Sequence, residues 1–305
     1  MDIKKEEIKD WLKFCRIEGI GSSKILKLLS IFGEFKRLYL ASDEELYRTR
    51  IFNAEMILKF RKIQKEEYYA DNYNLDICEK EGIKIIPIYS LEYPQNLKNL
   101  PDAPLTLYML GNLELIKSKK IAIVGSRESD KKALNWAYDL AKNLVRENII
   151  IVSGGAKGID YQAHVATLEN NGNTICVFGS GLLKLYPPEH RNMFQDIKKK
   201  GGLLISEHSP TDNGGRLSLL RRNRIISGIS DGIIIVTSAK VGGSRTQIEI
   251  ANKQRIPSFV PNRKLNLLPN EGINDAIIHH RITEIIDYKE VLNSIYKRDS
   301  VQKTL

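Results

Sequence analysis

The chain has 305 residues, with 42% hydrophobic and 28% charged side chains and a formal net charge of +10. This composition is typical of a folded chain of about two domains, and it excludes disorder over most of the length. Its apolar runs are too short to span a membrane, and its charged first residues are unlike a secretory signal, so we expect a cytoplasmic protein.

Residues 1–85 predict a small all-helical domain, because apolar residues recur three and four positions apart. Such a domain resembles the SAM-like or helix-hairpin-helix-like kind. The predicted helices cover 6–15, 22–32, 35–40, 42–46, 54–67 and 72–81. The turn at 17–22 contains Gly19 and Gly21, with Ser22 as the predicted cap of the next helix, and such turns can hold a DNA phosphate on their backbone amides. A plain connection between two helices is the favoured alternative, since residues 1–117 together carry no net charge.

Residues 86–117 predict a connector that packs on the domain after it. Prolines keep this segment extended and stop helices. They are Pro87, Pro94, Pro101 and Pro104.

Residues 118–305 predict a doubly wound α/β domain. Short runs rich in Ile and Val alternate with stretches of helix length, which suits strands that are buried on both faces of a mostly parallel sheet. The predicted strands cover 121–124, 149–152, 174–178, 203–205, 232–236 and 258–260, and a last helix covers 284–296.

The net charge belongs to this second part of the chain. Residues 1–117 hold 19 Lys and Arg against 19 Asp and Glu, while residues 118–305 hold 28 against 18. An excess confined to one domain favours a polyanionic partner, because neutralising phosphates releases counterions. A basic surface that serves only solubility is an equally good interpretation of charge alone.

Small residues follow five of the predicted strands, at the edge where a doubly wound sheet binds ligands. Glycine lets backbone amides approach a phosphate, serine adds a hydroxyl donor, and a following helix adds its positive end. The candidates are Gly125, Ser126, Ser153, Gly154, Gly155, Gly158, Gly179, Gly181, Gly243 and Ser244. One such turn alone is equally well explained by turn chemistry, whereas five together favour binding.

Cations beside these turns would supply charge for phosphate contacts. Arg127 and Lys157 lie within two of the turns, and the stretch 216–228 is a third source. The candidates in that stretch are Arg222, Asn223 and Arg224. Because its arginines cannot all share one helix face, we expect at least one of them to pair with an acid inside the fold.

Catalysis is poorly supported by the sequence. Asp160 and His164 stand four residues apart, near Ser153, as in a nucleophilic triad. A carboxylate in the first turn of a helix complements the helix dipole, however, and we expect His164 to form hydrogen bonds within the fold. The dinucleotide and Walker A motifs are missing, and the three cysteines are scattered, so we expect no cofactor and no metal.

Taken in order, these motifs resemble the DNA-processing protein A (DprA, or Smf) family over about residues 10–280. The matching stretches are Tyr93-Pro94, Gly125-Ser126-Arg127, Ser153 to Asp160, Gly179-Ser180-Gly181, Ser206-Glu207 and Arg222 to Gly228. The resemblance implies an extended Rossmann-like domain that binds single-stranded DNA, forms a homodimer and loads the RecA recombinase on the strand during natural transformation, without catalysis.

By carry-over from the family, the DNA-facing residues are Arg127, Lys157 and the glycine turns beside them. Two segments depart from the family pattern. Residues 216–220 lack the usual Phe, and the loop at 242–249 carries Arg245, which adds a candidate phosphate contact. The sequence leaves open whether aromatic side chains stack on bases or belong to the core. These side chains are Tyr161, Phe178 and Tyr186.

A nucleotide-binding or nucleotide-hydrolysing Rossmann protein of the lysine-decarboxylase-like (Lonely-guy) type is the alternative. Such enzymes use a Gly-Gly-x-Gly-Thr-x-x-Glu loop, which residues 242–249 resemble with Arg245 in place of the last glycine. A side chain at that position is expected to crowd a nucleotide phosphate, which favours DNA binding.

Overall fold

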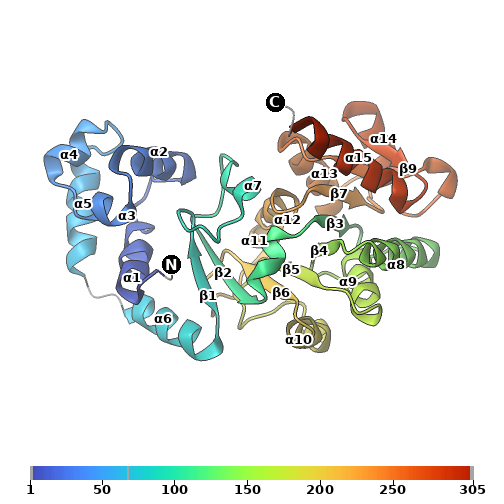
Figure 1. Ribbon diagram of the computed structural model, residues 1–305, viewed down its shortest axis with the longest axis horizontal. Helices are drawn as coiled ribbons and strands as arrows, with labels where there is room; N and C mark the ends of the chain where they lie inside the picture. The colour runs from blue at the N-terminus through green and yellow to red at the C-terminus, as the bar shows by residue number, and fades with distance from the viewer. Residues whose placement is uncertain (1–2, 67–68, 303–305) are drawn as a thin grey trace.

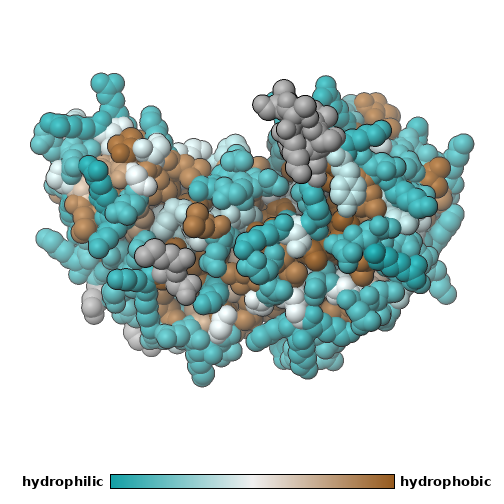
Figure 2. Space-filling model, in the orientation of Figure 1, coloured by the Kyte–Doolittle hydropathy of each residue, from teal (hydrophilic) through white to brown (hydrophobic). Residues whose placement is uncertain are grey.

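The chain leads from a helical region at its N-terminal end into a sheet covered by helices, as a computed structural model shows (Figure 1). The structure describes residues 3–66 and 69–302. Hydrophilic side chains cover most of the face shown in Figure 2, and hydrophobic ones are visible between them. In the described ranges, no helix combines the length and the apolar character that crossing a membrane requires.

The helical region follows the predicted pattern to within a few residues. Its helices are α1 (Lys5–Phe14), α2 (Ser22–Phe32), α3 (Phe35–Tyr39), α4 (Asp43–Arg48), α5 (Ala54–Lys65) and α6 (Tyr69–Glu81). The predicted end of the fifth helix, Glu67, lies outside the described residues. Ser22 is not the cap of α2: it lies within the helix and donates its hydroxyl hydrogen to the Pro101 carbonyl at 2.7 Å.

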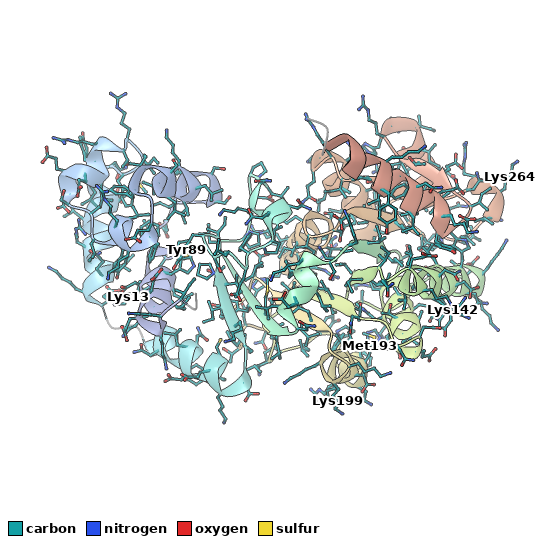
Figure 3. The ribbon with its side chains drawn as sticks, in the orientation of Figure 1. Lys13, Tyr89, Lys142, Met193, Lys199 and Lys264 are labelled. Atoms are coloured by element: carbon teal, nitrogen blue, oxygen red, sulfur yellow. The ribbon has the colours of Figure 1, made fainter. Side chains whose placement is uncertain are left out.

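An aromatic cluster joins the helical region to the sheet. The ring of Tyr89 lies 5.0 Å from that of Trp11 and 5.4 Å from that of Phe35, between the helices and the strand that precedes it (Figure 3). The Trp11 indole N–H donates to the Thr106 hydroxyl at 2.8 Å. Buried aromatic packing with a satisfied indole donor fixes the helical region on the sheet.

The connector contributes strands that the sequence analysis did not predict. Its elements are β1 (Lys84–Pro87), α7 (Gln95–Lys98), β2 (Thr106–Gly111) and the 3-10 helix η1 (Leu113–Lys117). Strand β2 pairs antiparallel with β1 and with β6. The prolines hid these strands, since proline is tolerated on an edge strand such as β1, where Pro87 is the last residue.

The sheet confirms the predicted doubly wound architecture. Its further strands are β3 (Lys120–Val124), β4 (Ile150–Gly154), β5 (Thr174–Phe178), β6 (Leu203–Ser206), β7 (Gly232–Ile235), β8 (Ser258–Pro261) and β9 (Thr283–Ile285). The described strands form one nine-stranded sheet in the order β1-β2-β6-β5-β4-β3-β7-β8-β9, parallel from β6 to β9. The predicted last helix begins as β9 and continues as α15 (Tyr288–Gln302).

Helices cover both faces of this sheet, which explains the unbroken apolar runs. Ile121 and Ile123 of β3 pack into one core cluster, while Ala122 and Val124 pack into another on the opposite face. The helices after β3 are α8 (Lys131–Arg146), α9 (Ile159–Glu169), α10 (Arg191–Lys199), α11 (Arg216–Arg221), α12 (Asn223–Gly228), α13 (Gly243–Lys253) and α14 (Glu271–His279). Short 3-10 helices cover η2 (Pro188–His190) and η3 (Arg263–Leu265).

Strand β3 marks the topological switch point of the sheet. It lies between β4 and β7, so the connections after β3 and β7 run to opposite sides and leave a crevice at the carboxyl ends of the two strands.

Candidate nucleic-acid interface

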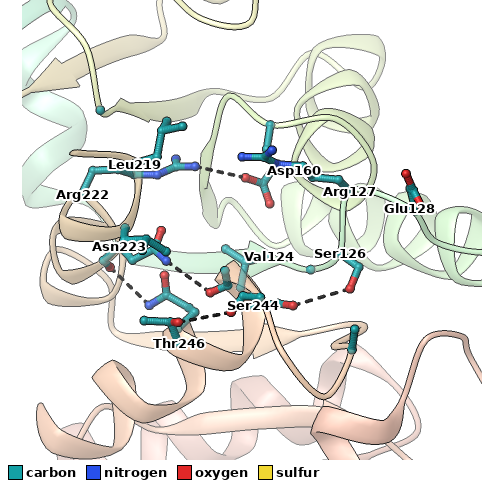
Figure 4. A pocket seen from close by; sticks show the side chains of 18 of the residues that line it. Val124, Ser126, Arg127, Glu128, Asp160, Leu219, Arg222, Asn223, Ser244 and Thr246 are labelled. Carbon is teal, nitrogen blue, oxygen red and sulfur yellow. Dashed lines mark hydrogen bonds and ion pairs between the residues drawn. The ribbon is translucent and has the colours of Figure 1, made fainter. Parts of the chain in front are cut away.

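A cavity of about 1280 Å³ opens at this switch point. Ser126 and Arg127 lie on one side of it, Arg222 and Asn223 on the other, and Ser244 between them (Figure 4). The cavity therefore lies where the glycine and serine turns were predicted to converge.

The turn after β3 brings a hydroxyl and a cation to the opening. A Cβ on Gly125 would lie 2.5 Å from Ile159 and 2.9 Å from the Thr237 hydroxyl, so only glycine fits there. The Ser126 N–H donates to the same hydroxyl at 3.0 Å, which fixes the turn. Arg127 is exposed, and its guanidinium has no hydrogen bond or ion pair with any residue of the described ranges.

The turn before α9 packs tightly on the turn after β3. Gly158 has a φ of 79°, and a Cβ there would lie 2.4 Å from the Ser126 carbonyl oxygen and 2.6 Å from that of Arg127. Glycine is thus required both by the backbone angle and by the close approach. Lys157 is exposed beside it, with Nζ 2.8 Å from Glu189 Oε1, and this hydrogen bond raises the pKa of Lys157.

Several predicted phosphate contacts are instead packed against protein. Gly154 lies under the Arg222 guanidinium, Gly155 under Phe194, and the Ser153 hydroxyl donates to the Ile123 carbonyl at 2.6 Å. A Cβ on Gly179 would lie 2.8 Å from the Leu219 nitrogen, and one on Gly181 would lie 2.1 Å from the Ser209 carbonyl oxygen. Ser153 and the four glycines serve close packing, because each is buried where a larger side chain or an exposed hydroxyl has no room. The residues whose predicted role is not supported are Ser153, Gly154, Gly155, Gly179 and Gly181.

Arg222 is the arginine that pairs inside the fold, as the sequence analysis expected of at least one. It is 6% exposed, its Nη1 donates to the Val177 carbonyl at 2.8 Å, and its Nη2 lies 3.7 Å from Asp160 Oδ2. Burial lowers the pKa of Arg222 and raises that of Asp160, while each charge opposes the shift of the other. The prediction that Arg222 contacts a phosphate is wrong, because its guanidinium is used in this buried pair.

Arg224 is also internal, and its predicted phosphate contact is likewise wrong. It donates two hydrogen bonds of 2.7 Å to the Glu207 carboxylate and one of 2.9 Å to the Asp102 carbonyl. This bidentate pair is strongly directional and joins α12 to the end of β6 and to the connector.

Asn223 positions the loop before α13. Its Nδ2 donates to the Gly243 carbonyl at 3.3 Å, and its own carbonyl accepts from Gln247 Nε2 at 3.2 Å. Asn223 is 7% exposed and lines the cavity, so its main role is to hold the start of α13 at this opening.

The start of α13 is an open glycine turn of the site. Gly242 and Gly243 are exposed, and a Cβ on either would meet no described atom within 4 Å. The first backbone bond of the helix runs from the Thr246 N–H to the Gly242 carbonyl, so the amides of 243–245 have no intrahelical acceptor. These amides are donors of the kind that a helix N-terminus offers to an anion, and the Ser244 side chain lies beside them.

Arg245 turns away from this site. Its Nη2 donates to Asp275 Oδ2 at 2.7 Å, its Nη1 lies 3.6 Å from Glu249 Oε1, and it does not line the cavity. The predicted contribution of Arg245 to phosphate binding is therefore wrong, and so is the crowding of a nucleotide phosphate that was expected from it.

Arg216 begins the basic stretch at 216–228 but was not among the candidate contacts predicted from the sequence. It is the first residue of α11, it is exposed, and it lines the cavity, with no ion pair within the described part of the chain. A cation in the first turn of a helix opposes the helix dipole, and this local conflict was a signal readable from the sequence.

His164 has the internal role that was expected. Its Nδ1 lies 2.8 Å from the Thr174 hydroxyl and its Nε2 lies 3.0 Å from the Gly154 carbonyl oxygen. Burial lowers the pKa of His164 to about 4, so the imidazole is neutral at physiological pH. Asp160 faces Arg222 instead of His164, so these residues do not form a triad.

Known proteins resemble this chain over most of its length. The family model described as DNA recombination-mediator protein A matches residues 84–295. DNA processing protein DprA of Streptococcus pneumoniae is 37% identical over 269 residues, covering 87% of this chain and 89% of the relative. Protein Smf of a Synechocystis strain is 28% identical over 295 residues, covering 93% and 72%.

Solved structures agree with these matches. The X-ray structure of DprA from Streptococcus pneumoniae superposes with a TM-score of 0.75 at 27% identity, over 96% of this chain and 98% of that one. A structure of DNA processing protein A from Helicobacter pylori, which concerns its single-stranded DNA binding mode, superposes with a TM-score of 0.63 at 28% identity, over 71% and 96%.

Proposed function

Since this chain belongs to the DNA recombination-mediator protein A family, we propose that it binds single-stranded DNA by its phosphates at the switch-point cavity. The Helicobacter pylori relative is described by its single-stranded DNA binding mode, which supports this choice of ligand. Binding is non-catalytic, and the role of the site is to hold and protect the strand.

Two unpaired arginines at one opening are the observation that carries this proposal. Arg127, after β3, and Arg216, at the start of α11, both line the cavity. Neither has a carboxylate partner among the described residues. Arg222, Arg224 and Arg245 each have such a partner. Cations left free beside a cavity suit a polyanion, because their charge is available to phosphates.

We assign the polar groups of the cavity to successive phosphates of the strand. One phosphate binds at the start of α13, where the free amides and the hydroxyls of Ser126 and Ser244 supply donors. Its neighbours bind Arg127 and Arg216, which can each donate two parallel hydrogen bonds to a phosphate. Lys157 holds the strand as a point charge at the entrance to α9.

A salt titration with matched variants tests this proposal. Wild type and Arg127→Glu are compared for binding to single strands of several sequences by fluorescence anisotropy. We expect the charge reversal to weaken binding by at least about tenfold on every sequence, and to reduce the dependence on salt by about one phosphate contact or more. The control is Lys199→Glu, which makes a charge reversal at the last residue of α10, just before β6 begins and so near the amino ends of the strands. Equal losses from both variants, or binding indifferent to salt, would reject the site.

Membership of the family is also the basis for a more specific proposal about assembly and partner. We propose that the chain acts in the cytoplasm as a homodimer and passes the bound strand to the RecA recombinase. Sedimentation at micromolar concentration is expected to show a dimer, and purified RecA is expected to form filaments faster on strands that carry this protein. A monomer without effect on filament formation would contradict this part alone.

One observation favours the alternative function. Because Arg245 turns away, the start of α13 is open to a nucleotide phosphate as well as to DNA. A nucleotide-hydrolysing enzyme would release the base from a nucleoside monophosphate, and Glu249→Gln would abolish that turnover. Base release that Glu249→Gln abolishes would replace the DNA-binding proposal. Absence of released base would support the DNA-binding proposal.

A further inference from the structure

Two exposed tyrosines stand beside Lys157, at the carboxyl edge of the sheet. Tyr161 is 36% exposed and Tyr186 is 52% exposed, whereas Phe178, the third aromatic residue that the sequence left open, is 2% exposed. Phe178 therefore belongs to the core, and the two tyrosines present aromatic surface to solvent next to the proposed DNA site.

Tyr161 is held in place by a row of rings that leads out of the core. Its ring centroid lies 4.3 Å from that of His190, which in turn lies 6.1 Å from that of Phe194. Phe194 packs edge-on against Phe178 at 4.8 Å. His190 is itself fixed, because its Nδ1 donates to the Gly155 carbonyl at 2.9 Å. A ring held in this way loses little freedom when another ring stacks on it.

Tyr186 connects this row to the cavity. It lines the cavity, and its carbonyl oxygen lies 3.2 Å from the place of a Cβ on Gly155, so its backbone packs on the turn before α9. The aliphatic residues of the same loop are covered: Leu182 is 2% exposed, and Leu183 and Leu185 pack against the core. The fold thus buries the aliphatic residues of this loop and leaves its aromatic residue in solvent.

Phosphate contacts by themselves do not select a single strand, since a duplex carries the same phosphates. Unpaired bases differ from a duplex by their free π faces, which aromatic side chains bind without reading the sequence. We propose that the bases of the bound strand stack on Tyr186 and Tyr161, near a phosphate held by Lys157, and that this stacking selects single strands over duplexes. The inference rests on the proposed function and adds to it the origin of strand selectivity.

The test compares single-stranded with double-stranded DNA of one sequence. We expect Tyr186→Leu to weaken binding of the single strand by about tenfold, the loss of one stacked base, and to leave duplex binding unchanged. Tyr186→Phe keeps the ring and is expected to retain the affinity. The matched control is Tyr47→Leu, at a 63% exposed tyrosine of the helical region.

A spectroscopic readout separates stacking from a structural role. A single strand that contains 2-aminopurine is expected to lose fluorescence when it binds wild type or Tyr186→Phe, and to lose less with Tyr186→Leu or Tyr161→Leu. On a strand with abasic sites, wild type and Tyr186→Leu are expected to bind alike.

The outcomes also distinguish this inference from the proposed function. If Tyr186→Leu binds both DNA forms as wild type does, or loses both equally, the stacking inference is overturned. If Arg127→Glu still weakens binding in that case, the phosphate site stands. If Arg127→Glu has no effect either, the proposed function fails as well.

Discussion

Arginine residues have different roles on the rim of the cavity and in the buried layer beneath it. On the rim, Arg127 and Arg216 are exposed and have no carboxylate partner in the described ranges. Beneath it, Arg222 is enclosed and paired, and Arg224 is held at the side by two hydrogen bonds to one carboxylate. Arg216 and Arg222 come from one stretch of seven residues, so proximity in sequence does not decide the role.

Burial explains the difference. A guanidinium that leaves water loses its hydration, so an internal arginine needs an acid and carbonyl acceptors in fixed positions. A guanidinium on the rim is solvated until a ligand arrives, and its donors are available to a phosphate. Burial and the presence of an acidic partner therefore decide whether an arginine near this cavity stabilises the fold or is available to a ligand.

Arg222→Met is expected to have the largest effect. It leaves the buried Asp160 carboxylate without its partner, which costs about 3–5 kcal/mol in the free energy of unfolding. Urea denaturation followed by circular dichroism measures this loss. Arg216→Met makes the same change on the rim and is expected to stay within about 0.5 kcal/mol of wild type. Similar losses for the two variants would remove the distinction between rim and buried layer.

Arg216→Met, which is expected to change stability little, is expected to change DNA binding strongly. We expect it to weaken binding of single strands by about tenfold and to lower the salt dependence by about one contact, because one phosphate loses its cation. Arg221→Met is the control, since Arg221 is exposed on the same helix but does not line the cavity. Anisotropy titrations at several salt concentrations measure both. An equal loss from Arg221→Met would mean that general charge, and not the cavity, carries the binding.

The buried layer is expected to make stability depend on pH through His164. Burial lowers the pKa of His164 to about 4 in the folded state, while in the unfolded chain it is about 6.5. Between these values the unfolded state binds the proton and the folded state does not, so stability falls as the pH is lowered. We expect a loss of about 1 kcal/mol from His164 between pH 7 and pH 5.5.

Denaturation at the two pH values, with His164→Gln as the comparison, measures this contribution. The variant does not titrate, so its loss over the same interval is expected to be smaller by that amount. If wild type and His164→Gln lose the same stability, the imidazole of the buried layer does not have the lowered pKa.

Glu189→Gln is expected to have the smallest effect, a change in single-strand affinity through the exposed Lys157. It removes the carboxylate that lies 2.8 Å from Lys157 Nζ, which frees the lysine for a phosphate. Because exposed ion pairs are weak, we expect single-strand affinity to rise by only about twofold. Glu114→Gln breaks a similar exposed pair in the connector, with Lys117 at 2.8 Å, and is expected to leave affinity unchanged. A fall in affinity with Glu189→Gln would place Lys157 outside the DNA path.

The fold was largely predictable because its core strands are buried on both faces. Such strands read as unbroken Ile and Val runs, and the predicted strand at 174–178 coincides with β5. Strands β1 and β2 lie toward one edge of the sheet among prolines, so their short apolar runs were interpreted as a connector. The position of the cavity was predictable too, since parallel strands place their carboxyl ends at one edge.

The roles of individual residues at that edge were less predictable. Glycine serves a phosphate contact and a close packing contact equally well, and the sequence pattern of the two is the same. Gly243 is open to a ligand, whereas Gly154 makes room for the Arg222 guanidinium. The distinction depends on residue 222, which is distant along the chain and adjacent only in the folded state.

The alternation of core strands and helices from β3 to β8, the basic character of residues 118–305 and the family resemblance were determined by the sequence alone, because each depends on local periodicity, composition or motifs. Tertiary structure decided which cations are free, which glycines are open and which tyrosines are exposed. These properties arise when segments far apart in the chain meet, and the pairing of a charge or the covering of a ring is fixed only by that contact.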